Sequence, residues 1–353
     1  MDRRIVIMAG GTGGHVYPAL AVALQLQKEN WQVTWMGTKT GIESRVVPEN
    51  NLVIDYVSVS GIRGKGLWRR FAVPFMLLKS LFQVFGILNR RKPAVILGLG
   101  GFVAGPGGVI AKMLGIPLVI HEQNRVPGTT NRILAKWADR VLEGFPNSFP
   151  ETSGAEYVGN PLRPAIEMLK SKKSAVQKPL NILVLGGSLG ARKLNEIVPD
   201  AFAMIHSVNV VHQTGLAMHE QVKTCYLNHK RSVEVVAFIE DMAARYSWAD
   251  LIICRSGAMT VSEVAAAGLP SIMIPFPFAI DDHQTANAQY LVDVKASILI
   301  AQSNLDAKQL AQQIEHLIDH PSQLDQMGKA ARQCAQWDAT KVVANICIDE
   351  GSI

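Results

Sequence analysis

The chain has 353 residues and a mass of 38.4 kDa, which is too long for one ordinary hydrophobic core and suits two domains of roughly 150–180 residues. Hydrophobic residues make up 48% of the chain and charged residues 18%, which excludes a disordered polyelectrolyte, and the 29 glycines cluster instead of repeating, which excludes a collagen-like chain. The net charge of +6 arises in the first part of the chain, because residues 1–160 hold 18 Lys and Arg against 10 Asp and Glu, whereas residues 161–353 hold 17 against 19.

Predicted strands alternate with predicted helices along the whole chain. Short apolar runs predict strands over residues 4–9, 32–36, 53–58, 94–97, 118–121 and 140–142, with helical patterns over 18–29, 106–114 and 130–138 between them. After a polar run at residues 170–179 the pattern restarts, with strands over 180–185, 209–212, 233–238, 251–254 and 271–274. Apolar strands joined by helices indicate parallel sheets covered on both faces. We therefore expect an α/β protein with two doubly wound, Rossmann-like domains that face a cleft, and ligands at the carboxyl ends of the strands.

Three glycine-rich loops each leave a predicted strand and enter a predicted helix: GGTGGH at residues 10–15, GGFVAGPGG at 100–108 and GGSLGA at 186–191. Glycine lets the backbone turn with positive φ, and a helix that starts there directs free N–H groups at a bound anion. Each loop alone is also compatible with a tight turn that binds nothing, but three in the same relative place favour phosphate binding.

Two common nucleotide-binding classes do not fit these loops. Counting from Gly11, the third glycine of a G-x-G-x-x-G dinucleotide motif would fall on Val16, and the second strand ends without an acidic residue for a ribose. No Walker lysine follows any of the loops, which disfavours an NTPase.

His15 and the tetrad His121-Glu122-Gln123-Asn124 are the candidate chemical groups of the first half. His15 ends the first loop shortly before Pro18, which suits the first turn of a helix, so it either caps that helix or serves as a general base. The tetrad follows an apolar strand and either lines a site or forms a solvated turn.

In the second half, polar residues follow two predicted strands. Thr260 and Glu263 fit a capping box, and the Glu263 carboxylate equally suits a vicinal diol, so the residues alone leave both roles open. The run Asp281-Asp282-His283 is a weak metal candidate, because three adjacent side chains do not readily face one ion.

An apolar and basic segment distinguishes the first half. Residues 63–92 hold eight basic residues and no acid, and residues 67–88 predict a helix along which Lys79, Gln83, Gly86 and Arg90 form a polar stripe. We interpret it as an interfacial helix on anionic lipid, against the alternative of a core helix with a solvated basic rim. Nucleic acid is disfavoured because no nucleic-acid motif is present. The residues expected to face the membrane are Trp68, Arg69, Arg70, Phe71, Phe75, Leu78 and Phe82.

The remaining signals are negative. The four cysteines form no CxxC pair and indicate reduced thiols, no export signal is expected, and the uncharged run at residues 93–111 holds six glycines and two prolines and does not suit a membrane span.

Six sequence motifs occur in a fixed order between about Ile5 and the C-terminus: GGTGGH, GGFVAGPGG, HEQN, GNPLR, GGSLGA, and RSGAMTVSEVAAAGLP followed by HQTANA. Because these motifs occur together and in this order, the chain resembles the bacterial MurG family of peptidoglycan glycosyltransferases. The resemblance implies a glycosyltransferase B-type fold and the inverting transfer of N-acetylglucosamine from UDP-N-acetylglucosamine to the 4-hydroxyl of the muramoyl sugar of lipid I, which gives lipid II. It implies no cofactor and no obligatory metal.

The resemblance also carries residues over to this chain. It implies UDP-N-acetylglucosamine binding by Thr12, Gly13, Gly14, Asn124, Arg163, Ser188, Ile239, Ala258, Met259, Thr260, Val261, Ser262, Glu263 and Gln284. In that assignment Ser188 and Arg163 hold the phosphates, the Ile239 backbone contacts uracil, Glu263 binds the ribose diol, and Asn124 and Gln284 bind sugar hydroxyls. His15 is the expected base and Glu122 the second choice.

The expected domains are an acceptor and membrane-facing domain at residues 1–162, completed by a C-terminal helix at 337–353, and a UDP-sugar domain at residues 163–336. The expected partners are lipid I, an anionic membrane surface and other cell-wall synthesis proteins, with the chain peripheral on the cytoplasmic face of the cell membrane. The resemblance further implies a part in cell-wall biogenesis, cell shape and cell division. The alternatives are another UDP-sugar enzyme of the same fold, such as a hydrolysing epimerase or a natural-product glycosyltransferase, and a non-catalytic nucleotide-sugar or membrane-binding module.

Overall fold

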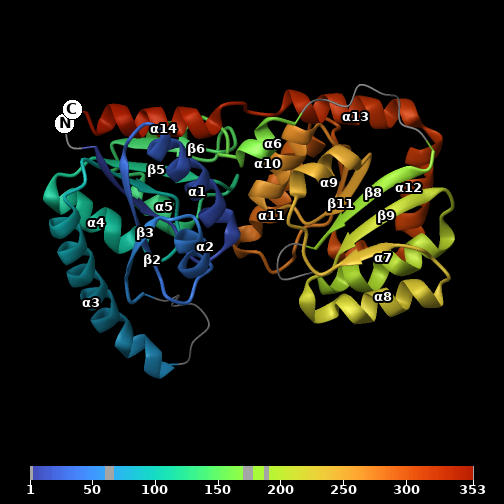
Figure 1. Cartoon of the computed structure of the whole chain (residues 1–353), viewed down its shortest axis with the longest axis horizontal. Helices are drawn as coiled ribbons and strands as arrows, with labels where there is room; N and C mark the ends of the chain where they lie inside the picture. The colour runs from blue at the N-terminus through green and yellow to red at the C-terminus, as the bar shows by residue number, and fades with distance from the viewer. Residues whose placement is uncertain (1–2, 60–66, 170–177, 187–190, 353) are drawn as a thin grey trace. The chain divides into compact units, whose positions relative to one another are not determined.

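The computed structural model describes residues 3–59, 67–169, 178–186 and 191–352, and for residues 67–74 the backbone only. The chain divides into two compact units: Met1–Arg163 with Asp338–Ile353, and Pro164–Trp337. Each unit is an α/β sandwich built on a parallel sheet (Figure 1).

The sheet of the first unit has the strand order β3-β2-β1-β4-β5-β6-β7, and all of its neighbouring strands are parallel. Its strands are β1 (Arg4–Met8), β2 (Gln32–Gly37), β3 (Val53–Tyr56), β4 (Val95–Gly98), β5 (Leu118–Glu122), β6 (Arg140–Glu143) and β7 (Glu156–Tyr157). The order reverses direction between β1 and β4. In open α/β sheets this switch point is where the loops after two neighbouring strands open toward a ligand.

Helices cover both faces of this sheet, as the alternation of strand side chains requires. They are α1 (Gly13–Lys28), α2 (Glu43–Glu49), α3 (Leu67–Arg91), α4 (Ala104–Leu114), α5 (Thr129–Leu134) and α14 (Ala339–Glu350). Ile5 and Ile7 of β1 are buried with α1 and α14 on one face, and Val6 and Met8 are buried with α3 and α4 on the other. The last helix of the chain, which the sequence could place on either domain, is therefore part of the first unit's core.

The second unit repeats the same plan. Its strand order is β10-β9-β8-β11-β12-β13, again all parallel, with the switch point between β8 and β11. The strands are β8 (Leu180–Leu185), β9 (Val208–Gln213), β10 (Glu234–Val236), β11 (Leu251–Cys254), β12 (Ser271–Met273) and β13 (Ser297–Leu299). The helices are α6 (Pro164–Glu167), α7 (Arg192–Met204), α8 (His219–Asn228), α9 (Met242–Trp248), α10 (Ala258–Ala267), α11 (His283–Val292), α12 (Ala307–Asp319) and α13 (Pro321–Gln333).

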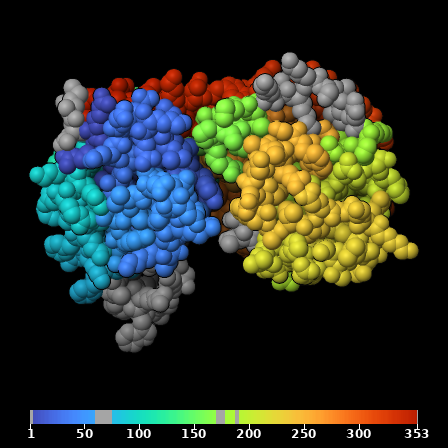
Figure 2. Space-filling model, in the orientation of Figure 1, coloured from blue at the N-terminus to red at the C-terminus, as the bar shows by residue number. Residues whose placement is uncertain are grey.

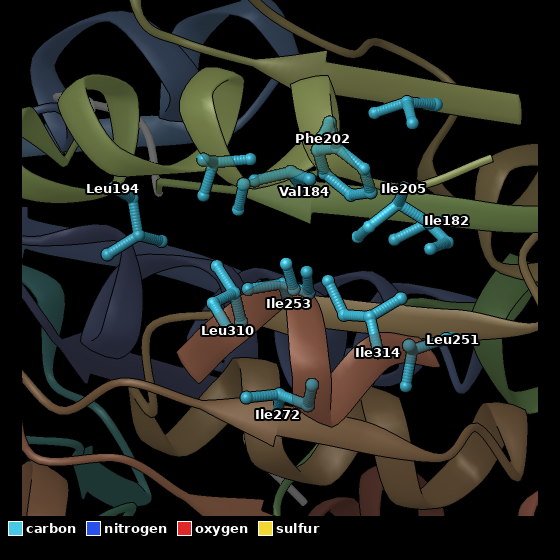
Figure 3. Packing of buried hydrophobic residues seen from close by; sticks show 14 of the residues in the cluster. Ile182, Val184, Leu194, Phe202, Ile205, Leu251, Ile253, Ile272, Leu310 and Ile314 are labelled. Atoms are coloured by element: carbon cyan, nitrogen blue, oxygen red, sulfur yellow. The ribbon is translucent and has the colours of Figure 1, made fainter. Parts of the chain in front are cut away.

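One hydrophobic cluster of the second unit lies between its sheet and the helices α7 and α12 (Figure 3). Ile182 and Ile253 of the central strands meet Phe202 of α7 and Ile314 of α12 there, and each is at most 1% exposed. Burying a side chain of this size contributes about 1.5–3 kcal/mol.

The predicted fold class is confirmed, and the eleven predicted strands all exist within a few residues of their expected bounds. The short strands β7 and β13 were missed. The predicted start of the first helix near Pro18 is wrong, because α1 begins at Gly13 and contains Pro18 in its second turn. Glycine is a poor helix former, but only four residues separate β1 from α1, and tertiary contacts in this short loop outweigh local helix propensity.

Candidate active site

Two glycine loops meet at the switch point of the first unit, one after β1 and one after β4. A Cβ atom on Gly101 would lie 2.5 Å from the carbonyl oxygen of Gly10, and Gly101 has a φ of +80°, so only glycine fits. At Gly100, where φ is +109°, a Cβ atom would lie 3.1 Å from Cε1 of His15. The second loop therefore packs against the first and against the ring of His15.

His15 lies in the first turn of α1, as the third helical residue. The N-cap is Thr12, which makes no side-chain capping hydrogen bond, so His15 is not the N-cap and the alternative in which it caps this helix is not supported. Thr12 is exposed, and Gly13 and Gly14 are half-buried. The free N–H groups of this helix start can bind an anion or a polar ligand.

The ring of His15 is connected to the strand β5 through Gln123. Its Nδ1 atom lies 2.6 Å from Oε1 of Gln123. Nε2 of Gln123 lies 2.9 Å from Nδ1 of His121 and 2.9 Å from the carbonyl oxygen of His121. Nε2 of His121 in turn lies 2.9 Å from the carbonyl oxygen of Gly159. Burial lowers the pKa of His121 to about 4, although the hydrogen bond to Gly159 and the negative charge of Glu122 each raise it.

Glu122 is 1% exposed and accepts four hydrogen bonds. Its Oε1 accepts from the backbone N–H and the side-chain amide of Asn124, and its Oε2 accepts from the N–H of Gly128 and the amide of Asn131. This buried carboxylate thereby fixes the turn that carries Asn124, which is itself half-buried.

A second buried carboxylate, Glu43, supports the first glycine loop. It is fully buried at the start of α2, and its Oε2 accepts a hydrogen bond from the N–H of Gly11 over 3.0 Å. Its Oε1 accepts from the N–H and the hydroxyl of Thr38. No motif in the sequence identified Glu43.

Arg163 closes the first unit. Its guanidinium lies over the ring of Tyr17 of α1, 5.9 Å from the ring centroid, so it belongs to the same unit as His15. Arginine over an aromatic ring keeps its positive charge.

In the second unit, the helix α10 carries the run from Ala258 to Glu263. Its N-cap is Gly257, which lacks a side chain, so the N–H groups of the first turn have no side-chain cap. Thr260 is the third helical residue and not the N-cap, so the predicted capping box is absent and Glu263 is not explained as a cap. Instead Oε2 of Glu263 accepts a hydrogen bond from the hydroxyl of Tyr246, which the sequence did not single out.

Other members of α10 divide by burial. Ala258 and Val261 are buried and anchor the helix, whereas Met259, Thr260 and Ser262 are half-buried. Uncapped N–H groups at the start of a ten-residue helix form a natural site for a phosphate.

Two more predicted residues lie close to backbone partners. The N–H of Ile239 donates to Oε1 of Gln213 over 3.1 Å, which leaves the Ile239 carbonyl as the group that can contact a base. Oε1 of Gln284 accepts from the N–H of Phe276, so its amide nitrogen is the end that can donate to a ligand. Ser188 and its neighbours at 187–190 lie outside the described residues.

Arg255, which precedes α10, is a structural residue that the sequence analysis passed over. Its guanidinium donates to the carbonyl oxygens of Ile274 and Pro275, and it stacks on the ring of Phe276. Burial lowers the pKa of Arg255 to about 10. These contacts hold the loop after β12.

Metal ligation at Asp281-Asp282-His283 finds no support in the geometry. The ring of His283 bonds to the carbonyl of Ile280, and Asp282 accepts from Thr285. Within the described ranges, the one group of three that gathers metal-type ligand atoms is Asp200, Cys225 and His229, in which His229 is hydrogen-bonded to Asp200.

The helix α3 exposes an apolar stripe on the first unit. Phe75, Leu78 and Phe82 are 77%, 52% and 69% exposed, while Val84, Ile87 and Leu88 on the other side are buried in the core. Figure 2 shows the described part of α3 as a teal region at the surface of this unit. Trp68, Arg69, Arg70 and Phe71 lie in this helix, but their side chains are outside the described residues.

The predicted polar stripe of α3 has two parts. Lys79 is exposed, whereas Gln83 hydrogen-bonds to Ser58 after β3. Arg90 and Arg91 both pair with Asp55, with N–O distances of 2.7 Å. Among the helices of the described residues, none is long and apolar enough to cross a membrane.

Two doubly wound units, each built on a parallel sheet, are the architecture of the two-domain glycosyltransferases, and the family comparison assigns the chain to that class. The glycosyltransferase family 28 N-terminal domain matches residues 5–143, and the family's C-terminal domain matches residues 181–343.

Named relatives extend this match to the whole chain. The chain is 54% identical over 352 residues to the UDP-N-acetylglucosamine–N-acetylmuramyl-(pentapeptide) pyrophosphoryl-undecaprenol N-acetylglucosamine transferase of Methylococcus capsulatus, covering 99% of each chain. It is 48% identical to the transferase of the same name from Shewanella denitrificans, covering 99% of this chain and 97% of that one. The crystal structure of Acinetobacter baumannii MurG superposes with a TM-score of 0.83 at 41% identity, covering 98% of this chain and 99% of that one. The chain belongs to the MurG family of glycosyltransferase family 28.

Proposed function

We propose that this enzyme transfers N-acetylglucosamine from UDP-N-acetylglucosamine to the 4-hydroxyl of the muramoyl sugar of lipid I, with inversion at the anomeric carbon, and so forms lipid II. The observation that carries the proposal is the 54% identity over 99% of the chain to a transferase named for this donor and acceptor. The arrangement of His15 and of the α10 helix start supports the same reaction.

We assign the acceptor to the first unit. Inversion in a single displacement needs a base that removes the proton of the attacking hydroxyl. His15 suits this role because its ring is half-buried at the switch point and, among the described residues, is hydrogen-bonded at Nδ1 and not at Nε2. Glu122 remains the second candidate, but its two oxygens already accept four hydrogen bonds within the chain, which favours a supporting role.

We assign the nucleotide to the second unit. The uncapped start of α10, together with the glycine loop that contains Ser188, provides N–H groups for the pyrophosphate. Glu263 binds the ribose diol, the Ile239 carbonyl accepts from N3–H of uracil, and the amide nitrogen of Gln284 donates to a sugar hydroxyl. Stabilising the departing diphosphate by fixed dipoles is the kind of electrostatic contribution that lowers a transfer barrier most.

The remaining donor contacts lie on the first unit. Thr12, Gly13 and Gly14 offer backbone and hydroxyl groups at the start of α1, Asn124 offers an amide, and Arg163 offers a cation for the phosphates. In this division Met1–Arg163 with the C-terminal helix forms the acceptor domain, and Pro164–Trp337 forms the donor domain.

We further propose that the chain is peripheral on the cytoplasmic face of the cell membrane, bound through α3. Lipid I is held in the bilayer by its undecaprenyl chain, so the enzyme must reach the surface, and the exposed stripe of Phe75, Leu78 and Phe82 provides the apolar contact. A role in cell-wall biogenesis, and through it in cell shape and division alongside other cell-wall synthesis proteins, follows from this reaction.

The decisive experiment measures transfer of labelled N-acetylglucosamine from its UDP form to a lipid I analogue. The expected product is the disaccharide lipid, with UDP-glucose and UDP-N-acetylgalactosamine as poor donors. Release of UDP without the lipid acceptor would indicate a hydrolysing epimerase, transfer to soluble acceptors alone a natural-product enzyme, and donor binding without turnover a non-catalytic module.

A further inference from the structure

Two backbone carbonyl groups fix the protons of a side-chain relay behind His15. The relay runs from Gly159 through His121 and Gln123 to His15, in contacts of 2.6–2.9 Å. A backbone carbonyl oxygen only accepts hydrogen bonds, so whichever side-chain atom lies against it must donate. Each assignment along the relay follows from this condition.

The first carbonyl is that of Gly159, which lies 2.9 Å from Nε2 of His121. Nε2 of His121 must therefore carry a proton. His121 is fully buried, and burial lowers its pKa to about 4, so the ring is neutral near pH 7 and carries no second proton. Its Nδ1 atom is then an acceptor.

The second carbonyl is that of His121 itself, which lies 2.9 Å from one end of the Gln123 amide. That end must be the nitrogen, and its second proton reaches Nδ1 of His121, also at 2.9 Å. The amide is thus oriented by two acceptors at once. Its oxygen consequently faces His15, at 2.6 Å from Nδ1.

An amide oxygen cannot donate, so Nδ1 of His15 carries the proton of that contact. We propose that Gln123 and His121 are positioning residues that hold His15 in the tautomer with its proton on Nδ1 and its lone pair on Nε2. This inference rests on the proposed role of His15 as the base.

The tautomer decides which atom does the chemistry. Nε2 of His15 takes the proton of the acceptor hydroxyl while the hydroxyl oxygen forms its bond to the anomeric carbon. The bond from that carbon to the diphosphate oxygen breaks, and its electron pair leaves with UDP. The resulting imidazolium keeps its Nδ1 proton, because the Gln123 amide is not basic. A carboxylate in this position orients the ring in other enzymes; here a neutral amide does so.

The tautomer can be measured directly on the free wild-type protein. Long-range proton–nitrogen NMR spectra of protein labelled at histidine nitrogen distinguish protonated from unprotonated ring nitrogens, and the His15→Ala spectrum identifies the His15 signals. We expect a protonated Nδ1 and an unprotonated Nε2 for His15, and the opposite for His121. A neutral His15 protonated at Nε2 would overturn the proposal. This measurement needs no activity, so its failure differs from failure of the transfer assay.

Gln123→Met keeps a similar side-chain volume and removes the amide oxygen and the amide nitrogen, so it breaks the contacts to His15 and to His121. We expect kcat to fall by about 10–10²-fold, the usual effect of losing a partner that orients a functional imidazole, and the Michaelis constant for the donor to stay within about twofold. In a His15→Ala background the same change should have almost no effect on kcat, because the relay acts only through His15.

The matched control is Asp139→Ala, which removes the hydrogen bond that the Asp139 carboxylate accepts from the N–H of Leu118 at the start of β5, whereas Gln123 follows the end of that strand. It should leave kcat within about twofold of wild type, as expected for a site remote from the chemistry. An unchanged kcat in Gln123→Met, or an equal loss in the His15→Ala background, would show that Gln123 does not position His15.

Discussion

The hydroxyl of Tyr246 donates a hydrogen bond to Oε2 of Glu263 over 2.9 Å, and both side chains are buried. Tyr246 lies on α9 and Glu263 on α10, so the bond connects these two helices of the second unit. In the proposed donor site Glu263 binds the ribose diol with both carboxylate oxygens, so diol binding depends on the orientation of the carboxylate. Tyr246 supplies that orientation.

This relationship predicts a graded loss of donor affinity. Tyr246→Phe removes a hydrogen bond to a charged group and should raise the Michaelis constant for UDP-N-acetylglucosamine by about 3–10-fold, and Glu263→Gln should raise it by more than about tenfold. Steady-state kinetics with both substrates varied provide the measurement. Tyr290→Phe is the control, because its hydroxyl donates to the Cys334 carbonyl in the same unit. An effect on the lipid acceptor alone would refute the ribose assignment.

His15→Ala should lower kcat by about 10²–10⁴-fold, the span that loss of a general base usually produces. UDP binding by calorimetry should remain within about twofold, because the ring is assigned to the acceptor hydroxyl and not to the nucleotide. The exposed His206 provides a matched control, since His206→Ala removes an imidazole from the second unit's surface. A loss of less than tenfold in His15→Ala would assign the base elsewhere.

The sequence predicted the sheets because buried parallel strands are continuous apolar runs, and these are visible without any tertiary information. Helix starts were harder to predict. α1 begins in a run of glycines that local propensity disfavours, and the packing of Gly13 against the ring of Tyr17 is not encoded in the local pattern. The Thr260–Glu263 capping box, one of the two roles that the residues left open for Glu263, is absent because the helix begins two residues before Thr260, although the spacing fits the motif.

Within the site, the motifs located the candidate groups but not their supports. Gln123 contacts His15 across 108 positions of sequence, and Glu43 reaches Gly11 across 32. Neither pairing follows from spacing, because it depends on how the strands are ordered in the sheet. The contact of Tyr246 with Glu263 could not be predicted either, because it joins two different helices and no motif marks Tyr246.

Glu122→Gln tests whether this carboxylate supports the turn or acts as the base. Each oxygen of Glu122 accepts two hydrogen bonds. In Glu122→Gln one of these oxygens becomes an NH2 group in either orientation of the amide, so two donors of the turn lose their acceptor. We expect the free energy of unfolding in urea to fall by about 1–3 kcal/mol. The control is Glu156→Gln at the partly exposed pair with Arg140, which should cost less than about 1 kcal/mol. Wild-type stability combined with a loss of more than about 10²-fold in kcat would make Glu122 the base.

His212 should make the second unit less stable in mild acid. It is fully buried, its ring contacts the Tyr226 hydroxyl and the Asn195 amide, and burial lowers its pKa to about 3. The unfolded chain, with an ordinary histidine pKa of about 6.5, binds the proton first, so stability is complete above about pH 6.5 and declines as the pH falls toward 3.

The decline should amount to about 1.4 kcal/mol from His212 between pH 7.5 and 5.5, because one pKa unit corresponds to about that energy. Urea midpoints at the two pH values measure it. His212→Gln should reduce the difference between the midpoints, whereas His206→Gln at the surface should leave it unchanged. An equal pH dependence in His212→Gln and wild type would contradict the prediction.

Membrane binding through α3 should depend on both its apolar stripe and its basic residues. We expect co-sedimentation with anionic vesicles and little with neutral ones, weakening as salt rises, since each basic residue near such a surface contributes about 1 kcal/mol. Arg90 and Arg91 pair with Asp55, so the exposed Lys79 is the residue better placed to interact with anionic lipid. Lys79→Gln should weaken vesicle binding by up to about tenfold.

Replacing Phe75 and Phe82 together by Ser should reduce vesicle binding by about 10–10²-fold, given the area that each ring buries. Met204→Ser, at an exposed position of α7, serves as the control. Equal binding to neutral and anionic vesicles, or no loss in the double variant, would exclude α3 as the membrane-binding surface.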